Sequence, residues 1–287
     1  MNVLVATDGS KYGRWALSWA AMLPLVEPPK VTALHVVDVA TLRAPVLAQP
    51  VMAGNERYIQ EEIQRMAARS AKIFKEAQQQ LASLKLTGTA RKEQGPVAPT
   101  ILKWAPKRDG LLVVGSQGLD ALDRFMLGSV STNLIHHATC PVLVVKGEAS
   151  PLRRMILAID GSDASAKALK FVLTKFQSDQ PTSKSRRVPI HVTVLHVLPV
   201  VMYPGLKETS KKLLEQGVQK LTKAGFTAEP LCYLGNPAEE IMKAASQQQA
   251  DLIVMGAQGL GAIARFLIGS VSTRVVQHAN GSVLVVR

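Results

Sequence analysis

Aromatic residues, cysteines and long apolar runs are scarce in this chain of 287 residues. Because aromatic residues make up only 5% of it, valine, leucine, isoleucine and alanine must fill its core. The two cysteines, Cys140 and Cys232, lie 92 residues apart and form no CxxC pair, which argues against a disulfide framework and a metal site. The simplest compartment for such a chain is a reducing cytoplasm.

Segments for membrane insertion or secretion are absent as well. The longest apolar stretches, such as Met155–Ile159 and Val197–Met202, are far shorter than the roughly 18–20 residues of a membrane span. The first residues lack a basic region followed by an apolar one, and Asp8 lies where a secretion signal would still be apolar. We therefore expect a soluble, cytoplasmic protein with no membrane partner.

Acidic residues are fewer than basic ones, 21 against 34, and the formal net charge is +13. Residues 1–149 carry 17 basic and 12 acidic residues, and residues 150–287 carry 17 and 9, so both halves are basic. A positive field favours nucleotides, nucleic acid or anionic lipid without choosing among them. Ordinary solvated helix faces explain the same charge, so it assigns no partner by itself.

The chain is a tandem repeat. VLVATDGS at residues 3–10 returns as ILAIDGS at 156–162, and VTALHVVDV at 31–39 returns as VTVLHVLPV at 192–200. Residues 115–132 match residues 256–273 at 12 of 18 positions without a gap. A repeat of this length is a whole domain, and the segment KGEASPL at Lys146–Leu152 is a linker. The sequence therefore predicts two domains, residues 1–147 and 152–287.

Within each copy, short β-branched runs alternate with helical patterns. In the first copy the runs lie at residues 3–6, 31–37, 111–114 and 141–145, and a long helix is predicted near residues 55–84. Runs without polar alternation are typical of parallel strands with helices on both faces, so we predict an α/β fold.

The predicted long helix and the segment before it carry two further expectations. Pro45 and Pro50 make residues 40–54 a loop, which is either a connector or a lid at the edge of the sheet. Apolar residues at a spacing of three to four predict one buried stripe along the helix: Ile59, Ile63, Met66, Ile73, Phe74, Ala77 and Leu81.

Ligands of an open parallel sheet bind beyond the carboxyl ends of its strands, where three features of each copy recur. The first is an aspartate after strand 1, Asp8 or Asp160, which either contacts a sugar, base or metal or caps the next helix.

The second feature is the end of strand 2. A histidine in an apolar run, His35 or His196, is expected to be a buried core residue rather than a catalytic one. The backbone of the next residue, Val36 or Val197, is placed to bond an adenine edge.

The third feature is a glycine-rich loop before a helix. Gly115-Ser116-Gln117-Gly118 is followed after nine residues by Gly128-Ser129, and Gly256-Ala257-Gln258-Gly259 is followed after nine by Gly269-Ser270. Glycine lets the backbone approach a phosphate, and the N–H groups at a helix N-terminus bind anions. The hydroxyls of Ser129, Ser131, Ser270 and Ser272 can add donors. Tight turns would explain one such cluster, but its recurrence at equal spacing favours phosphate binding.

With these motifs, the chain resembles the universal stress protein family in its tandem form, over essentially its whole length. Both copies match the family signature Gly-x2-Gly-x9-Gly-(Ser/Thr) after an apolar strand. The resemblance implies two doubly wound, five-stranded parallel-sheet domains of the Rossmann-like, adenine-nucleotide-binding type. It also implies ATP, alone or with Mg²⁺, as the ligand.

The resemblance further implies a role for each matching position. Asp8 and Asp160 would contact the ribose, and Val36 and Val197 would contact the adenine through their backbone. The remaining positions would cradle the phosphates: Gly115, Ser116, Gln117, Gly118, Gly128, Ser129, Val130 and Ser131, with Gly256, Ala257, Gln258, Gly259, Gly269, Ser270, Val271 and Ser272. The family often carries arginine or histidine at the positions of Gln117 and Gln258. Arg124 and Arg265 either replace that charge or are surface residues.

No catalytic motif accompanies the signature. A GxxxxGK[ST] loop and a recurring triad are both missing, so binding is better supported than turnover, and ATP hydrolysis would be slow at most. We expect a protein that senses or buffers adenine nucleotide in a cytoplasmic stress response and signals to protein partners. The alternatives are a scaffold that binds no nucleotide and, on charge alone, a nucleic-acid binder.

The last strand of each copy, Pro141–Val145 or Ser282–Val286, is a candidate apolar sheet edge that invites pairing. In the single-domain relatives that the chain resembles, such strands pair across a dimer. We therefore expect the two copies to pack about a pseudo-two-fold axis as an intrachain pseudo-dimer, with a further homodimer left open.

Overall fold

The computed structural model describes residues 1–38, 55–107, 109–118, 127–181, 187–200, 205–259 and 268–287. The expected loop at residues 40–54 and the two arginines Arg124 and Arg265 lie outside these ranges. The first half of the chain forms β1 (Asn2–Ala6), α1 (Lys11–Met22), β2 (Lys30–Val37), α3 (Asn55–Ser83), β3 (Gly88–Gln94), α4 (Val97–Trp104), β4 (Leu111–Gly115), α5 (Ser129–His137) and β5 (Val142–Val145).

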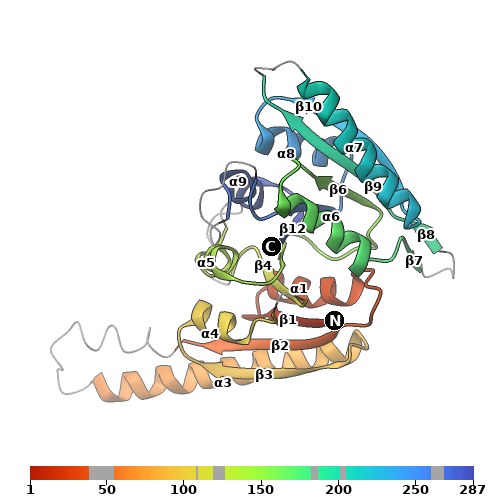
Figure 1. The fold of residues 1–287 in the computed structure, drawn as a ribbon. Coiled ribbons are helices and arrows are strands. Elements are labelled where there is room, and N and C mark those ends of the chain that lie inside the picture. The colour runs from red at the N-terminus through yellow and green to blue at the C-terminus, as the bar shows by residue number, and fades with distance from the viewer. Residues whose placement is uncertain (39–54, 108, 119–126, 182–186, 201–204, 260–267) are drawn as a thin grey trace.

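The second half repeats this order and adds a short antiparallel ribbon, β7 with β8. Its elements are β6 (Arg154–Ala158), α6 (Asp163–Lys175), β7 (Asp179–Pro181), β8 (Arg187–Pro189), β9 (His191–Leu198), α7 (Leu206–Lys223), β10 (Thr227–Leu234), α8 (Pro237–Gln247), β11 (Leu252–Gly256), α9 (Ser270–His278) and β12 (Ser282–Val286). Figure 1 shows the two halves stacked, with the C-terminus between them.

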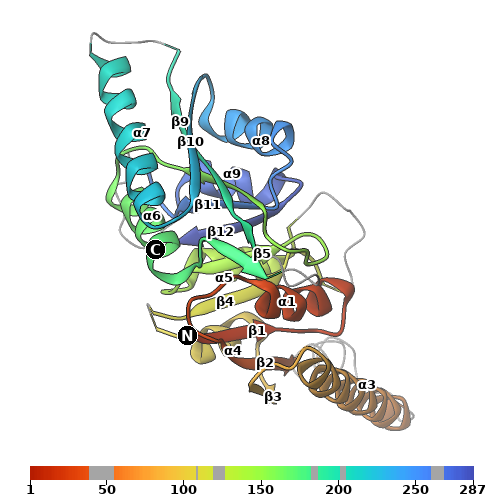
Figure 2. The ribbon, with the colours of Figure 1, turned by 90° about the vertical axis from the view of Figure 1, so that its right-hand side faces the viewer.

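All ten main strands form one sheet in the order β10-β9-β6-β11-β12-β5-β4-β1-β2-β3. Within each half the five strands are parallel, whereas β5 and β12 pair antiparallel at the seam (Figure 2). The centre of this seam is the pair Leu143–Leu284, which occupies the same position in the two repeats. The predicted fold and its pseudo-two-fold packing are therefore confirmed.

Two apolar layers, one on each face of the sheet, explain the unbroken apolar strands. Val3 and Val5 of β1 point into the layer covered by α1, α3, α6 and α7. Leu4, between them, points into the layer covered by α4, α5, α8 and α9. Because side chains alternate along a strand, a strand buried on both faces needs apolar residues at every position.

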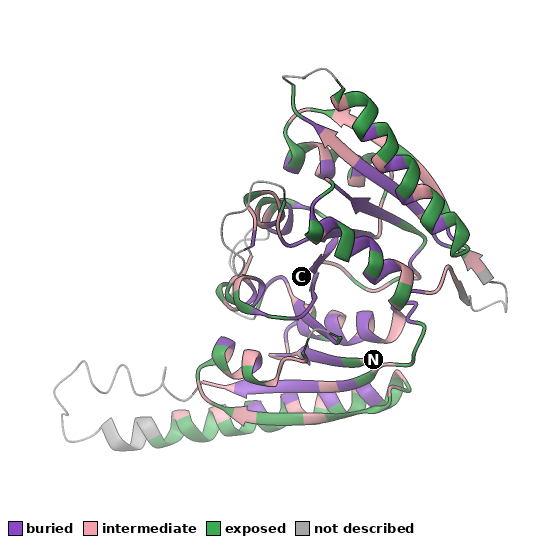
Figure 3. Ribbon diagram, in the orientation of Figure 1, coloured by how far each residue is buried: buried purple, intermediate pink, exposed green. Residues whose placement is uncertain are grey.

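Helix α3 departs from the predicted single buried stripe. Ile73, Ala77 and Leu81 are buried, but Ile63 is 48% exposed and Met66 is only half-buried. The cause is length, since α3 has 29 residues and its counterpart α7 has 18. Figure 1 shows that the first turns of α3 run past the end of the sheet. In Figure 3, the residues of this part that are coloured by burial are mostly exposed.

Among the residues that the structure describes, no helix is both long and apolar enough to cross a lipid bilayer.

Candidate functional site

The turn after the first strand of each half is held by an aspartate and a serine. Asp8 Oδ1 accepts the Ser10 N–H at 2.9 Å, and Ser10 Oγ in turn accepts the Gly13 N–H at 3.1 Å as the N-cap of α1. The same bonds join Asp160 to Ser162, the N-cap of α6, at 3.0 Å. The serine therefore caps the helix, and the aspartate uses one oxygen to hold the turn.

The other carboxylate oxygen of each aspartate faces the glycine-rich loop. A Cβ built on Gly118 would lie 2.9 Å from Asp8 Oδ2, and one built on Gly259 would lie 2.8 Å from Asp160 Oδ2. A side chain at either position would push the carboxylate aside, so glycine lets the carboxylate keep this place beside the loop. The fold thus brings the predicted aspartate and the second signature glycine together at the carboxyl edge of each half-sheet.

Backbone hydrogen bonds close the base of the glycine-rich loop. Ser116 N–H donates to Val145 O at 2.8 Å, and Gly128 N–H donates to Ser116 O at 2.8 Å. In the second half, Ala257 N–H donates to Val286 O at 2.8 Å, and Gly269 N–H donates to Ala257 O at 2.7 Å. These bonds place the start of α5 or α9 directly beside the end of β4 or β11. Ser116, Gln117 and Ala257 are buried in this base.

The first glycine of each signature is required by the packing of a helix against a strand. A Cβ on Gly115 would lie 2.6 Å from Tyr12 Cβ of α1, and one on Gly256 would lie 2.5 Å from the Ala164 carbonyl carbon of α6. Helix and strand could not pack so closely with a side chain there. Gly115 and Gly256 therefore position α1 and α6, and their need for glycine does not depend on a ligand.

Helices α5 and α9 begin without a side-chain cap. Their N-cap residues, Gly128 and Gly269, have no side chain to accept a hydrogen bond, whereas Ser10, Ser162 and Asn236 cap α1, α6 and α8. The first intrahelical bonds run from Thr132 N–H to Gly128 O and from Thr273 N–H to Gly269 O, both at 2.9 Å. The preceding N–H groups have no acceptor within the helix: Ser129, Val130, Ser131, Ser270, Val271 and Ser272. Such N-termini attract anions.

The serine hydroxyls of these helices divide into two kinds. Ser131 Oγ donates to Gly115 O at 2.6 Å, and Ser272 Oγ lies 3.0 Å from Gly256 O, so both hydroxyls tie the helix to the neighbouring strand. Ser129 and Ser270, at the first helical position, are exposed. Of the four predicted hydroxyl donors, only these two lie on the surface at the helix N-terminus.

The histidine of the second strand is part of the protein interior. His35 is 8% exposed, and its Nδ1–H donates to Thr7 O at 3.0 Å. Burial lowers the pKa of His35, so the ring is neutral at pH 7 with its proton on Nδ1. His196 is half-buried, contacts Ser210 Oγ at 2.8 Å and also has a pKa lowered by burial. The expectation that His35 is a buried core residue is confirmed.

The valine after this histidine directs its backbone toward the site. Leu34 O accepts the Thr7 N–H at 2.9 Å, so the polar groups of Leu34 face β1. Alternate residues of a strand face the same neighbour, so the N–H and C=O of Val36 also point to that side, beyond the last β1–β2 pair. The same register places Val197 beyond the end of β6. One donor and one acceptor therefore face the carboxyl edge near each aspartate.

Sequence reasoning missed one residue of this arrangement, Gly13 of α1. A Cβ on Gly13 would lie 2.8 Å from Thr7 Oγ1 and 3.1 Å from Asp8 Oδ1, so glycine leaves room for these two side chains in the first half, whereas Ser165 stands at the matching position of the second half. The only local signal for Gly13 is its position three residues after the N-cap serine. Across the described part of the chain, no group of three histidine, cysteine or acidic side chains is arranged to hold a metal ion.

Comparison with known proteins finds the same family for both halves. The profile of the universal stress protein family matches residues 1–146 and 151–287. A universal stress protein of Mycolicibacterium smegmatis is 30% identical over 307 aligned residues, covering 100% of this chain and 97% of that one. Universal stress protein YxiE of Bacillus subtilis is 32% identical over 145 residues, which cover 47% of this chain and 98% of YxiE.

Among solved structures, a universal stress protein from Archaeoglobus fulgidus has a similar fold over the whole chain. Its TM-score is 0.69 at 20% identity, and the alignment covers 100% of this chain and 98% of that structure.

Proposed function

The chain belongs to the universal stress protein family, and from this premise we propose that each half binds one adenine nucleotide, ATP, at the carboxyl edge of its sheet. One observation carries the proposal. In both halves the aspartate oxygen, the second signature glycine and an uncapped helix N-terminus meet at one place. A Cβ built on Gly118 would lie 2.9 Å from Asp8 Oδ2, and one built on Gly259 would lie 2.8 Å from Asp160 Oδ2.

The chemistry of these groups fits the three parts of ATP. The uncapped N–H groups and the positive dipole end of α5 or α9 would hold phosphate oxygens, aided by the exposed hydroxyl of Ser129 or Ser270. The carboxylate of Asp8 or Asp160 accepts hydrogen bonds, as the ribose hydroxyls require. The N–H and C=O of Val36 or Val197 complement the acceptor and donor that adenine carries on one edge.

These residues favour retention of the nucleotide over its turnover. Phosphoryl transfer needs an in-line nucleophile, charge clamps and a positioned metal. Of the described residues at the edge of the first half, Asp8 already holds a turn and His35 is neutral, with Nδ1 bonded to Thr7. We therefore propose a cytoplasmic sensor or buffer of ATP, with or without Mg²⁺, that hydrolyses ATP slowly at most and signals its state to protein partners during stress.

The test is to denature extensively washed protein and to measure the adenine nucleotide that it releases, followed by titration of nucleotide-free protein with ATP. We expect release of up to two adenine nucleotides per chain and saturable binding. The control is Gly147→Val, because a Cβ on Gly147 meets nothing within 4 Å. No release and no binding at millimolar ATP would favour the scaffold. Binding of nucleic acid that falls steeply with salt, without ATP binding, would favour the nucleic-acid binder.

A further inference from the structure

The residue that follows the last strand of each half lies against the other half. In the antiparallel pair of β5 and β12, the end of each strand runs beside the start of the other. The start of β12 follows α9, and the start of β5 follows α5. The first residue after β5 is Lys146, and the first after β12 is Arg287, its counterpart in the repeat. The register therefore brings Lys146 to the C-terminus of α9 and Arg287 to that of α5.

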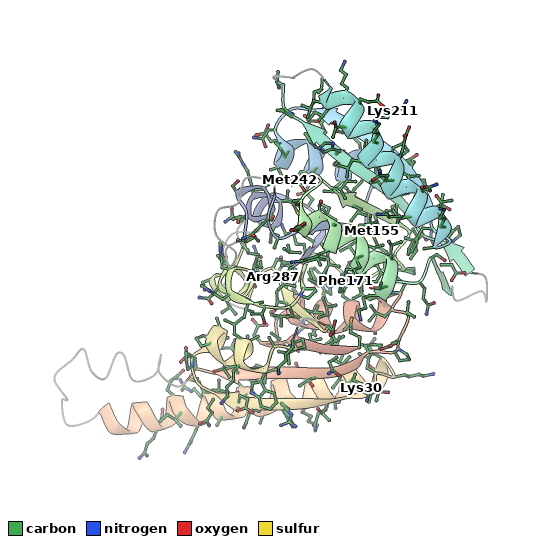
Figure 4. All side chains as sticks on the ribbon, in the orientation of Figure 1. Lys30, Met155, Phe171, Lys211, Met242 and Arg287 are labelled. Carbon is green, nitrogen blue, oxygen red and sulfur yellow. The ribbon has the colours of Figure 1, made fainter. Side chains whose placement is uncertain are left out.

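Both cations donate hydrogen bonds to carbonyls at these helix ends. Lys146 Nζ donates to Gln277 O at 3.1 Å and to Ala279 O at 2.5 Å. Arg287 Nη2 donates to Ile135 O, and Figure 4 shows Arg287 between the two halves. The last carbonyls of a helix have no N–H partner within it, and the C-terminus is the negative end of the helix dipole. Each half thus supplies the cation that completes a helix of the other half.

The two cations are partly buried at the seam. Burial lowers the pKa of Lys146 to about 8, and burial also lowers the pKa of Arg287. Desolvating a cation is unfavourable unless nearby polar groups compensate. The helix-end carbonyls compensate Lys146 Nζ and Arg287 Nη2, whereas Arg287 Nε is buried without a hydrogen-bond partner.

The helices that they contact are the ones whose N-termini face the candidate nucleotide sites. Each has nine residues and is therefore only about 13 Å long. The N-terminus of α5 is tied to its own half through Gly128 and Ser131, and its C-terminus is tied to the other half through Arg287. The helix whose N–H groups face the site at one end is therefore contacted by the opposite half at its other end.

We propose that Lys146 and Arg287 are positioning residues for the nucleotide sites of the opposite half, Lys146 for the second site through α9 and Arg287 for the first site through α5. This inference rests on the proposed function and extends it, because each site then requires both halves of the chain. It predicts that removal of a cation from one half weakens binding in the other half.

The test measures ATP affinity in full-length protein with one site left intact. Gly128→Val leaves the second site, and Gly269→Val leaves the first. With Gly128→Val, we expect Lys146→Met to weaken ATP binding by about three- to tenfold and Arg287→Met to change it less than twofold. With Gly269→Val, we expect the reverse. Lys146→Arg should restore binding, and Lys220→Met, which removes an exposed lysine from α7, is the matched control.

The crossed pattern separates positioning from general stability, because a loosened fold would weaken both sites together. Equal losses at both sites, or a loss only in the half that carries the substitution, would overturn the inference. If Lys146→Met does not fold, Lys146→Gln removes the charge and keeps a donor, and the same crossed pattern is expected. If the wild-type chain binds no ATP, the proposed function is wrong and the inference falls with it; if the wild-type chain binds ATP and the crossed pattern is absent, the inference alone is wrong.

Discussion

In the first half, Asp8 Oδ2 lies 2.9 Å from the position of a Cβ on Gly118, and in the second half the same distance at Asp160 and Gly259 is 2.8 Å. Away from this edge the halves diverge. Helix α3 has 29 residues and α7 has 18, and His35 bonds the Thr7 carbonyl where its counterpart contacts a serine hydroxyl. The two halves thus share the geometry of the carboxyl edge, where each would bind one ligand, although their helices and strand-2 histidines differ.

The largest effect should come from the seam, where the halves are most alike. Leu143→Ala and Leu284→Ala should each lower the free energy of unfolding by about 2–5 kcal/mol, because both residues are fully buried at the centre of the β5–β12 pair. Chemical denaturation measures the change. Ile63→Ala is the control and should cost far less, since Ile63 is exposed on α3. A large cost for one leucine and almost none for the other would contradict the pseudo-two-fold packing.

The aspartates should be the side chains that affect binding most. Asp8→Ala should weaken ATP binding at the first site by about 10- to 100-fold, because a charged acceptor is lost, and Asp160→Ala should do the same at the second. His35→Ala should affect binding less, since the ring bonds Thr7 inside the protein. Calorimetric titration of each variant gives the affinities. A folded His35→Ala protein with the greater loss would reverse these two roles.

The signature glycines should separate into packing and binding positions. Gly115→Ala and Gly256→Ala should each lower the free energy of unfolding by about 1–3 kcal/mol, because the new methyl group would overlap α1 or α6. Gly128→Ala should leave stability nearly unchanged, since its Cβ would meet only ordinary contacts from 3.5 Å outward. Thermal unfolding compares the three. An equally unstable Gly128→Ala protein would show that this glycine also serves packing.

The smallest effect should be a dependence of stability on pH from the two strand-2 histidines. Burial lowers the pKa of His35 and His196 in the folded state below the value of about 6.5 for an unfolded chain. Below that pH the unfolded chain binds more protons, so the free energy of unfolding should fall as the pH decreases from 7 to 5. Urea denaturation at each pH measures the slope. His35→Gln should reduce the slope, and an unchanged slope would show that His35 does not contribute.

Much of the fold could be predicted because most strands are buried on both faces. Residues 3–6 and 111–114 are continuous apolar runs for that reason, whereas the edge strand β3, with the sequence GTARKEQ, is largely exposed and has no such pattern. The residues alone therefore predicted four strands per half, and the fifth came from the family resemblance. The exposed start of α3 was also missed, because the apolar spacing continues past the end of the sheet that buries the rest of it.

At the candidate site, the sequence predicted the residue types and the two helix starts but not every cause. Spacing alone cannot show that position 115 must be glycine because Tyr12 of α1 packs against it, since that contact depends on how a helix and a strand pack. The contacts of Lys146 and Arg287 depend on the register of β5 with β12, which no local pattern encodes.

The most direct test of the account is the number of ATP molecules bound per chain at saturation. The geometry at Asp8 and Gly118 recurs at Asp160 and Gly259, so the wild-type chain should bind two. Gly128→Val and Gly269→Val should each leave one, because a branched side chain would fill the space before the helix N-terminus, and the double variant should bind none. A wild-type chain that saturates at one ATP, lost with one substitution and unaffected by the other, would contradict the equivalence of the two halves.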